Sequence, residues 1–177
     1  GSLRELAGLL SSGQVETLVV LNDNPVYTAP ADVEWLKNQR KARTIVRLGY
    51  VEDETGSLCD WHFPATHYLE SWGDGRTADG TLVPVQPLIA PLFDGITELE
   101  FLARLSGMTV TSPHEIVRET FKTLAGSGDF EGQWKTFLHD GFLAGSASPV
   151  LTGALRTRPI IAAVSTLPVP AAADAAR

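Results

Sequence analysis

The sequence predicts an α/β fold: a three-layer, doubly wound, mostly parallel sheet with a C-terminal helical extension. Residues 17–21 form an uninterrupted apolar run, which is typical of a strand covered on both faces. Residues 44–48 form a second such run, and a segment with helix signals separates the two. Strong turn chemistry at residues 22–25 directly follows the first run. Short strands that alternate with helices in this way predict parallel strands joined by helical connections.

Two helices are expected to accompany the first two strands. The first opens with capping-box spacing at residues 2–5, carries leucines on one face and stops at Gly13. The second is expected from Pro30 to about Lys41, because proline is tolerated in the first turn of a helix.

Weaker elements follow the second strand. The acidic residues 52–54 suit the positive N-terminus of a short helix, which is expected to end near Cys59. Further strands of the same sheet are expected at about residues 60–63 and 82–86.

Beyond Gly95 the chain is expected to be helical. The first helix begins at Thr97, the second opens with a capping box at residues 112–115, and a third is marked by aromatic residues near 130–138. One further strand is expected at residues 160–164. Leu99, Leu102 and Leu105 are expected to face inward on the first helix. Val117, Phe121 and Leu124 lie at helical spacing on the second, and the residues that mark the third are Phe130, Trp134, Phe137 and Leu138.

The domain organisation that we expect is one α/β domain cut from a longer protein. Residues 1–2 are typical of the scar of a cleaved expression tag. Residues 3–107 form the α/β domain, residues 108–149 are its helical extension, and residues 150–177 are a loose tail or the start of a next segment.

Composition excludes several classes of function. The chain has 177 residues, a net charge of −7 and no basic run, so nucleic acid is not an expected partner. Its single cysteine, Cys59, excludes an internal disulfide and an iron–sulfur cluster held by this chain alone. No apolar run approaches the ~20 residues that span a bilayer, so direct membrane insertion is not expected.

Polar residues follow the first two strands, at the edge where open α/β sheets bind ligands. Asn22, Asp23 and Asn24 follow the first strand, and their amides suit a base or ribose edge, whereas the alternative is a turn that bonds its own backbone. Glu54 and Thr55 follow the second strand, where helix capping is the alternative to ligand binding.

The segment 59–73 is the densest in aromatic and polar side chains. Its spacing of histidines does not match a metal site, and a Cys59–His62 nucleophilic pair lacks an identifiable orienting group. We expect no catalytic and no metal-binding residues, and we interpret the segment as a surface that packs against a neighbouring domain. The candidate interface residues are Trp61, His62, His67, Tyr68, Glu70 and Trp72.

Several motifs in a fixed order carry a family resemblance. They are LNDNPVYT at residues 21–28, then Glu-Thr at 54–55, Asp60, Phe-Pro at 63–64, and Glu-x-x-Gly at 70–73. Over about residues 15–107 this order resembles the third, Rossmann-like domain of the molybdopterin oxidoreductases. That domain has a Gly-x-Asn-Pro loop, then Glu-Thr, Ala-Asp-x-x-Leu-Pro and Glu-x-x-Gly.

A narrower likeness lies within that family. The stretches WH at 61–62, HYLESWGD at 67–74 and QPLIAPL at 86–92 are similar to the large iron–sulfur subunit of alternative complex III, a quinol:electron acceptor oxidoreductase. The helical stretch at 117–134 and LHDG at 138–141 also fit that subunit.

The resemblance implies which residues face a cofactor in active members. Residues 22–25, Glu54 and Thr55 match the positions that hold one guanosine of bis-molybdopterin guanine dinucleotide. Asn22 stands where the family often has glycine, and of the family's Asn-x-Glu-Gly-Arg-x-Gln stretch only Gln86 remains. The likeness therefore implies a retained fold with a vestigial cofactor pocket.

The function that we expect from the resemblance is a scaffold and interaction domain without its own redox centre. Its parent would be a membrane-associated, periplasmic bacterial respiratory oxidoreductase that uses iron–sulfur clusters held elsewhere. The implied partners are the remaining domains of the parent, a multihaem cytochrome c and a membrane quinol-binding subunit. The alternatives are a working guanosine-binding domain of a molybdenum enzyme and a freestanding nucleotide-binding enzyme.

Overall fold

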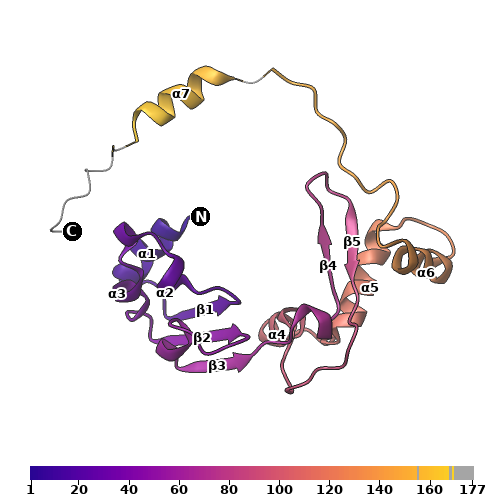
Figure 1. Ribbon diagram of the computed structural model, residues 1–177, viewed down its shortest axis with the longest axis horizontal. Helices are drawn as coiled ribbons and strands as arrows, with labels where there is room; N and C mark the ends of the chain where they lie inside the picture. The colour runs from indigo at the N-terminus through magenta and orange to yellow at the C-terminus, as the bar shows by residue number, and fades with distance from the viewer. Residues whose placement is uncertain (155, 168, 170–177) are drawn as a thin grey trace. The chain divides into compact units, whose positions relative to one another are not determined.

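A three-stranded parallel sheet organises the N-terminal part of the chain (Figure 1). In this computed structural model the strands are β1 (Thr17–Leu21), β2 (Thr44–Gly49) and β3 (Trp61–Pro64), in the order β1-β2-β3. The register places Val46 opposite both Val19 and Trp61. The α/β class is confirmed, as are the two parallel strands predicted from apolar runs and the weaker third strand predicted at about residues 60–63.

The structure describes residues 1–154, 156–167 and 169, which divide into two units at Ser148. The sheet, the helices around it and the C-terminal helices up to α6 belong to the first unit.

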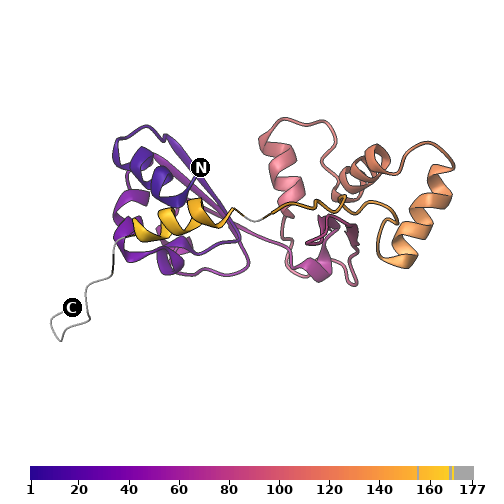
Figure 2. The same cartoon turned by 90° about the horizontal axis from the view of Figure 1, so that it is seen from above.

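Helices α1 (Leu3–Ser11) and α3 (Trp35–Gln39) cover one face of the sheet (Figures 1 and 2). Ser2 caps α1 by accepting a hydrogen bond from the backbone N–H of Glu5, as the predicted capping box requires. Buried apolar residues from both helices and from the first two strands form one cluster beneath them. Its members are Ala7, Leu10, Leu18, Val20, Val33, Trp35, Ala42 and Ile45.

The single helix expected from Pro30 to Lys41 is wrong. A short helix α2 (Pro25–Thr28) comes first, followed by the 3-10 turn η1 (Ala31–Val33) and then α3. Glu34 separates the last two, because its φ of 47° places it in the left-handed region, where a right-handed helix cannot continue. The short helix expected before Cys59 is present as the 3-10 turn η2 (Gly56–Leu58).

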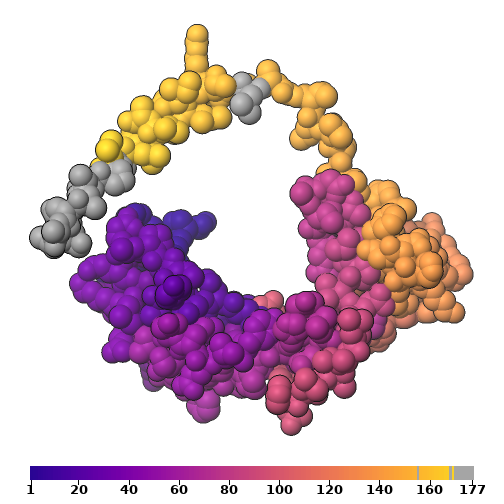
Figure 3. Space-filling view, in the orientation of Figure 1, coloured from indigo at the N-terminus to yellow at the C-terminus, as the bar shows by residue number. Residues whose placement is uncertain are grey.

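The strand expected at residues 82–86 exists but is not part of the parallel sheet. β5 (Leu82–Val85) pairs antiparallel with β4 (Gly73–Arg76) in a hairpin of its own. The connection at residues 77–81 is far shorter than the dozen or so residues that a parallel crossover needs. The hairpin tip, which projects from residues 1–147 in Figure 3, is tied by hydrogen bonds from Thr77 and Thr81 that lower the pKa of Asp79 to about 2.

Three helices complete the first unit, as the sequence predicts: α4 (Glu98–Leu105), α5 (Pro113–Leu124) and α6 (Phe130–Asp140). Thr97 caps α4 through the N–H of Glu100, whereas Ser112 makes no side-chain cap bond at α5, so the capping box expected there is wrong. Val117, Phe121, Trp134 and Phe137 are buried with Leu82 in a second apolar cluster.

The inward face predicted for α4 is confirmed only for Leu99, which is half-buried and packs against the second apolar cluster. Leu102 and Leu105 are exposed, and Phe101 and Ala103 are buried instead. The aromatic ring of Phe101 packs against Phe63 of β3 at 5.6 Å, so the helix turns its aromatic side toward the sheet. On α5, Leu124 is exposed because it lies at the last turn of the helix.

The second unit contains helix α7 (Thr157–Ser165) where a strand was expected. Its described side chains are exposed, and the described residues of this unit include no strand with which a strand here could form a ladder. Of the predicted tail at residues 150–177, positions 155, 168 and 170–177 lie outside the described residues.

We predict that Phe121→Ala lowers the free energy of unfolding by about 3–5 kcal/mol, because it opens a cavity among buried rings. Phe121 is 0% exposed and packs 4.7 Å from Phe137 and 5.3 Å from Trp134. Urea unfolding followed by tryptophan fluorescence measures the loss. Leu124→Ala, in the same helix but 42% exposed, is the matched control and is expected to change stability by about 0.5 kcal/mol. Equal losses would contradict the core assigned to α5 and α6.

Candidate functional site

The carboxyl ends of β1, β2 and β3 lie at the same edge of the sheet, where α/β sheets place their ligands. Asn22 follows β1, Tyr50 follows β2, and Thr66 lies two residues beyond β3. The loops after these strands therefore supply the polar side chains of the edge.

Most of the cofactor-matching residues predicted from the sequence meet here. Thr55 donates through Oγ1 to Asn24 Oδ1 at 2.7 Å, and Asn24 donates through Nδ2 to Glu54 Oε2 at 2.7 Å. The backbone N–H of Val26 donates to Thr55 Oγ1 at 3.1 Å. The loops after β1 and β2 are thus joined by side chains that lie about thirty positions apart in the sequence.

The remaining three predicted residues, Asn22, Asp23 and Gln86, make separate hydrogen bonds. Asn22, with φ 47°, donates through Nδ2 to Glu98 Oε1 at 2.5 Å, and Asp23 Oδ1 accepts from the backbone of Asn24 at 2.8 Å. Gln86 lies past β5 and donates instead to the carbonyl of Leu138 at 2.9 Å.

A buried ion pair lies beneath these loops. Arg47 of β2 is 3% exposed and donates to both carboxylate oxygens of Asp53. The same carboxylate accepts hydrogen bonds from the backbone N–H of Thr55 at 3.0 Å and of Gly56 at 2.9 Å. Burial alone would raise the pKa of Asp53, but these hydrogen bonds and the guanidinium charge outweigh it and hold the pKa below its ordinary 3.8.

Charge at this edge is poorly matched to a nucleotide diphosphate. Asn24 and Thr55 satisfy each other, and the hydrogen bond from Asn24 lowers the pKa of Glu54, which keeps that carboxylate charged. The guanidinium charge of Arg47 is already paired with the carboxylate of Asp53. A diphosphate at this loop would therefore meet carboxylates rather than the cations and free N–H donors that bind it.

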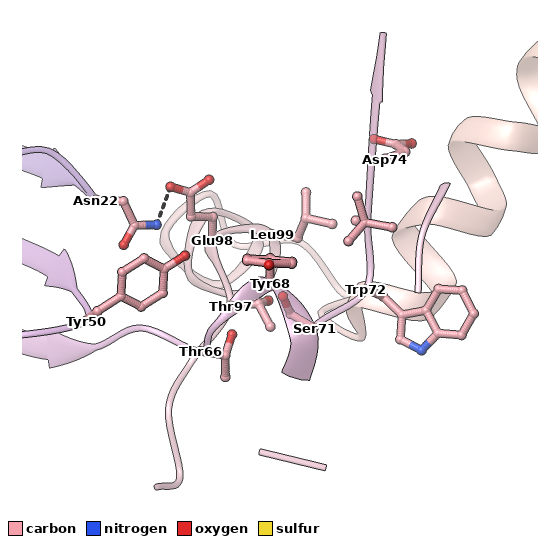
Figure 4. Close-up of a pocket in the computed structure, with 12 residues that line it drawn as sticks. Asn22, Tyr50, Thr66, Tyr68, Ser71, Trp72, Asp74, Thr97, Glu98 and Leu99 are labelled. Carbon is pink, nitrogen blue, oxygen red and sulfur yellow. Dashed lines mark hydrogen bonds between the residues drawn. The ribbon is translucent and has the colours of Figure 1, made fainter. Parts of the chain in front are cut away.

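A cavity of about 230 Å³ opens beside the loop (Figure 4). Strand-end residues Asn22, Tyr50 and Thr66 line it together with residues of the β4 hairpin and the start of α4. Glu98 forms part of the wall and holds the amide of Asn22, the contact drawn in Figure 4.

Most of these lining residues are not among the site residues predicted from the sequence. Tyr50 and Thr66 were detectable in principle, because each closely follows a strand of the parallel sheet. Asp74 and Glu98 gave no local signal, since only the folding of the hairpin and α4 brings them to the strand ends.

The six predicted interface residues lie on strand β3, on a 3-10 turn and on the segments that flank this turn. Trp61 is 62% exposed on one face of β3, whereas the half-buried His62 follows it on the opposite face, with its Nε2 3.2 Å from the carbonyl of Gly49. Trp72 is half-buried and packs 4.7 Å from His114 of α5.

The remaining three lie together on the 3-10 turn η3 (Tyr68–Glu70) and its cap. His67 Nδ1 accepts a hydrogen bond from the backbone N–H of Leu69, and the Glu70 carboxylate accepts one from the backbone N–H of His67. Tyr68 is exposed, and its ring lies 4.2 Å from that of His67. These polar groups therefore stabilise the turn itself.

Cys59 is held as a protonated thiol. Burial raises the pKa of Cys59 above its ordinary 9.0, and its Sγ donates to the carbonyl of Thr55 at 3.1 Å. In the described part of the chain no hydrogen bond joins it to His62. This environment does not favour a nucleophilic thiolate.

The described ranges contain neither a metal-binding cluster nor a membrane-spanning helix. No cluster of three or more His, Cys, Asp or Glu side chains there is placed to hold a metal ion. No helix among the described residues has the length and apolar character needed to cross a membrane.

Comparison with known proteins adds no assignment. No protein-family model matches the chain, and no curated protein is significantly similar to it.

We predict that Asp53→Asn lowers the free energy of unfolding by about 3 kcal/mol at neutral pH, because it leaves the Arg47 charge buried without its counter-ion. The difference from the wild type should shrink in acid. The pKa of Asp53 is lowered by folding, so its stabilisation is present above pH 3.8 and is lost as the pH falls through the folded-state pKa.

Asp32→Asn is the control for that measurement. It breaks the Arg4–Asp32 pair, whose side chains are 71% and 62% exposed, and should cost less than about 1 kcal/mol. Chemical denaturation at pH 7 and pH 3 distinguishes the two variants. A loss for Asp53→Asn as small as that for Asp32→Asn would contradict the role of the buried pair.

Proposed function

We propose that the chain is a scaffold and docking domain of an electron-transfer oxidoreductase, and that it contributes an interaction surface and no redox centre of its own. The single observation that carries this proposal is an apolar sheet face that the chain leaves partly uncovered. That face is formed by β2 and β3 and is bordered by α4.

The register of the sheet defines this face. Paired residues of parallel strands point to the same side, so Trp61 shares a face with Val46, and Phe63 with Leu48. The opposite face is buried under α1 and α3. On the open face Trp61 and Leu105 are each 62% exposed, and they border a groove of about 540 Å³.

An uncovered face of this kind favours an intermolecular or interdomain contact. Purely parallel sheets are almost always covered on both faces, because both carry apolar residues. Here α4 provides cover on the second face mainly through the contact of Phe101 with Phe63. Exposed aromatic rings within an apolar groove are typical of the centre of a protein interface.

The finer fold assignment belongs to the same proposal. We infer that β1–β3 are the core of a three-layer, doubly wound, Rossmann-like domain whose outer layer on the Trp61 side is completed by other segments of the parent protein. The sequence likeness to the third domain of molybdopterin oxidoreductases supports this reading, since that domain is built in this way.

The parent that the likeness supports is the large iron–sulfur subunit of a quinol-oxidising respiratory complex of the alternative complex III type. In this proposal the parent is periplasmic and membrane-associated in a bacterium, and its partners are a multihaem cytochrome c and a membrane quinol-binding subunit. Electrons pass through iron–sulfur clusters held by other domains, and the present chain positions those domains.

A second candidate is a guanosine-binding domain for bis-molybdopterin guanine dinucleotide. The observation that favours it is the meeting of Asn22, Asn24, Glu54 and Thr55 at the strand edge. The surrounding carboxylates count against it. Saturable amide shifts of residues 22–24 and 54–55 with GDP in an NMR titration would establish this function, and no shift at millimolar GDP would remove it.

We predict that Trp61 and Phe63 are modified by hydroxyl radicals in the 177-residue chain and are protected in the assembled parent protein. Mass-spectrometric footprinting of both samples measures the change, and protection by at least about fivefold is expected for a buried interface centre. Tyr27, which is 76% exposed and lies outside the groove, is the internal control and should react equally in both samples. Equal reactivity of Trp61 in the two samples would overturn the docking proposal.

A further inference from the structure

The cavity at the strand ends differs from the docking face in place and in chemistry. It is lined by Asn22, Tyr50, Thr66, Tyr68, Asp74 and Glu98, among others, and neither Trp61 nor Phe63 takes part (Figure 4). Its lining contains two carboxylates and no lysine, arginine or histidine. A site of this composition repels anions and attracts positive charge.

Thr66 is the first sign that the cavity is built for a ligand. The residue is 6% exposed, and its Oγ1 has no hydrogen-bond partner among the described residues. In Figure 4 this hydroxyl is directed toward the middle of the labelled group and not back into its own loop. A buried hydroxyl without a partner costs free energy, which a bound polar group would recover.

Asp74 is the second sign, on another wall of the same cavity. Its Oδ2 is buried and has no partner among the described side chains and backbone groups. Burial raises the pKa of Asp74 above its ordinary 3.8, although the nearby charge of Arg76 acts in the opposite direction. A ligand that brings N–H donors and positive charge would satisfy this oxygen and offset the cost of burying the carboxylate.

Aromatic rings line the same cavity. Tyr50 and Tyr68 are both more than half exposed, and Trp72 lies deeper against α5. Faces of tyrosine and tryptophan attract guanidinium and ammonium groups that lie within about 6 Å. Carboxylates combined with aromatic faces are therefore matched to an organic cation.

We propose that this cavity binds a guanidinium or alkylammonium group. Asp74 and Glu98 supply the counter-charge, Thr66 accepts a hydrogen bond, and the rings of Tyr50 and Tyr68 contact the cation. A metal ion fits less well, because no group of three or more candidate ligands exists among the described residues. The cation has two possible sources, a free amine or guanidine and the arginine or lysine side chain of a partner protein.

An NMR titration of the isotope-labelled 177-residue chain tests the proposal with two matched probes. Butylguanidinium carries the cation, and butylurea is its neutral isostere. We expect saturable shifts of the Thr66, Asp74 and Leu99 amides and of the Trp72 indole with butylguanidinium at millimolar concentration, and none with butylurea. The absence of saturable shifts with butylguanidinium, or equal shifts with butylurea, would overturn the proposal.

Variants assign the binding to the cavity. Asp74→Asn should lower the affinity for butylguanidinium by about tenfold. Glu98→Gln should lower the same affinity severalfold. Because Glu98 is exposed, this variant keeps the test valid if Asp74→Asn does not fold. Asp79→Asn, at the hairpin tip outside the cavity, is the matched control and should leave the affinity unchanged. Equal affinities for all three variants would place the cation elsewhere and contradict the assignment.

A second titration distinguishes the two sources of the cation. The short peptides Gly-Arg-Gly and Gly-Lys-Gly are compared with butylguanidinium and butylammonium under the same conditions. Tighter binding of the peptides identifies a partner's side chain, because the cavity then also contacts the peptide backbone. Tighter binding of the free compounds identifies a small-molecule amine or guanidine.

Discussion

The buried pair of Arg47 and Asp53 is the interaction on which the candidate site depends. It joins the middle of β2 to the loop that follows it, and Asp53 then fixes the backbone of Thr55 and Gly56. Thr55 in turn holds Asn24, so one ion pair orders the loops after two strands. The arrangement leaves no room for a side chain at Gly49, where a Cβ would lie 2.7 Å from Arg47 Nε. A charge buried this deeply is tolerated only while its partner is present.

A second constraint is the difference between the two faces of the parallel sheet. One face is closed by α1 and α3, and the other meets α4 mainly at Phe101. Apolar residues such as Trp61 remain exposed on that side. Association that covers such an apolar face is favourable, because it removes apolar surface from water. The first unit thus combines strand-end loops ordered by hydrogen bonds with a sheet face that is partly uncovered.

Local sequence signals predicted much of the fold because they depend on near neighbours. The apolar runs located β1 and β2, Thr97 was recognised as a cap, and the aromatic spacing of α5 and α6 located the second core. The signals failed where a distant contact decides the outcome. Leu102 and Leu105 of α4 are exposed because the helix instead buries Phe101 against Phe63 of β3, and residues 160–164 lie in helix α7, whose unit contains no strand among its described residues.

The residues of the candidate site likewise differ in whether a local sequence signal or a distant contact identifies them. The sequence by itself determined the α/β class, the parallel strands and the polar loop residues Asn22, Asn24, Glu54 and Thr55, because strand ends and turns have local signatures. Only the tertiary structure decided which residues share the cavity. Asn22 and Glu98 meet across 76 positions, and Asp74 reaches the same cavity from a hairpin. Such contacts depend on how separate elements pack, and no pattern within one element records them.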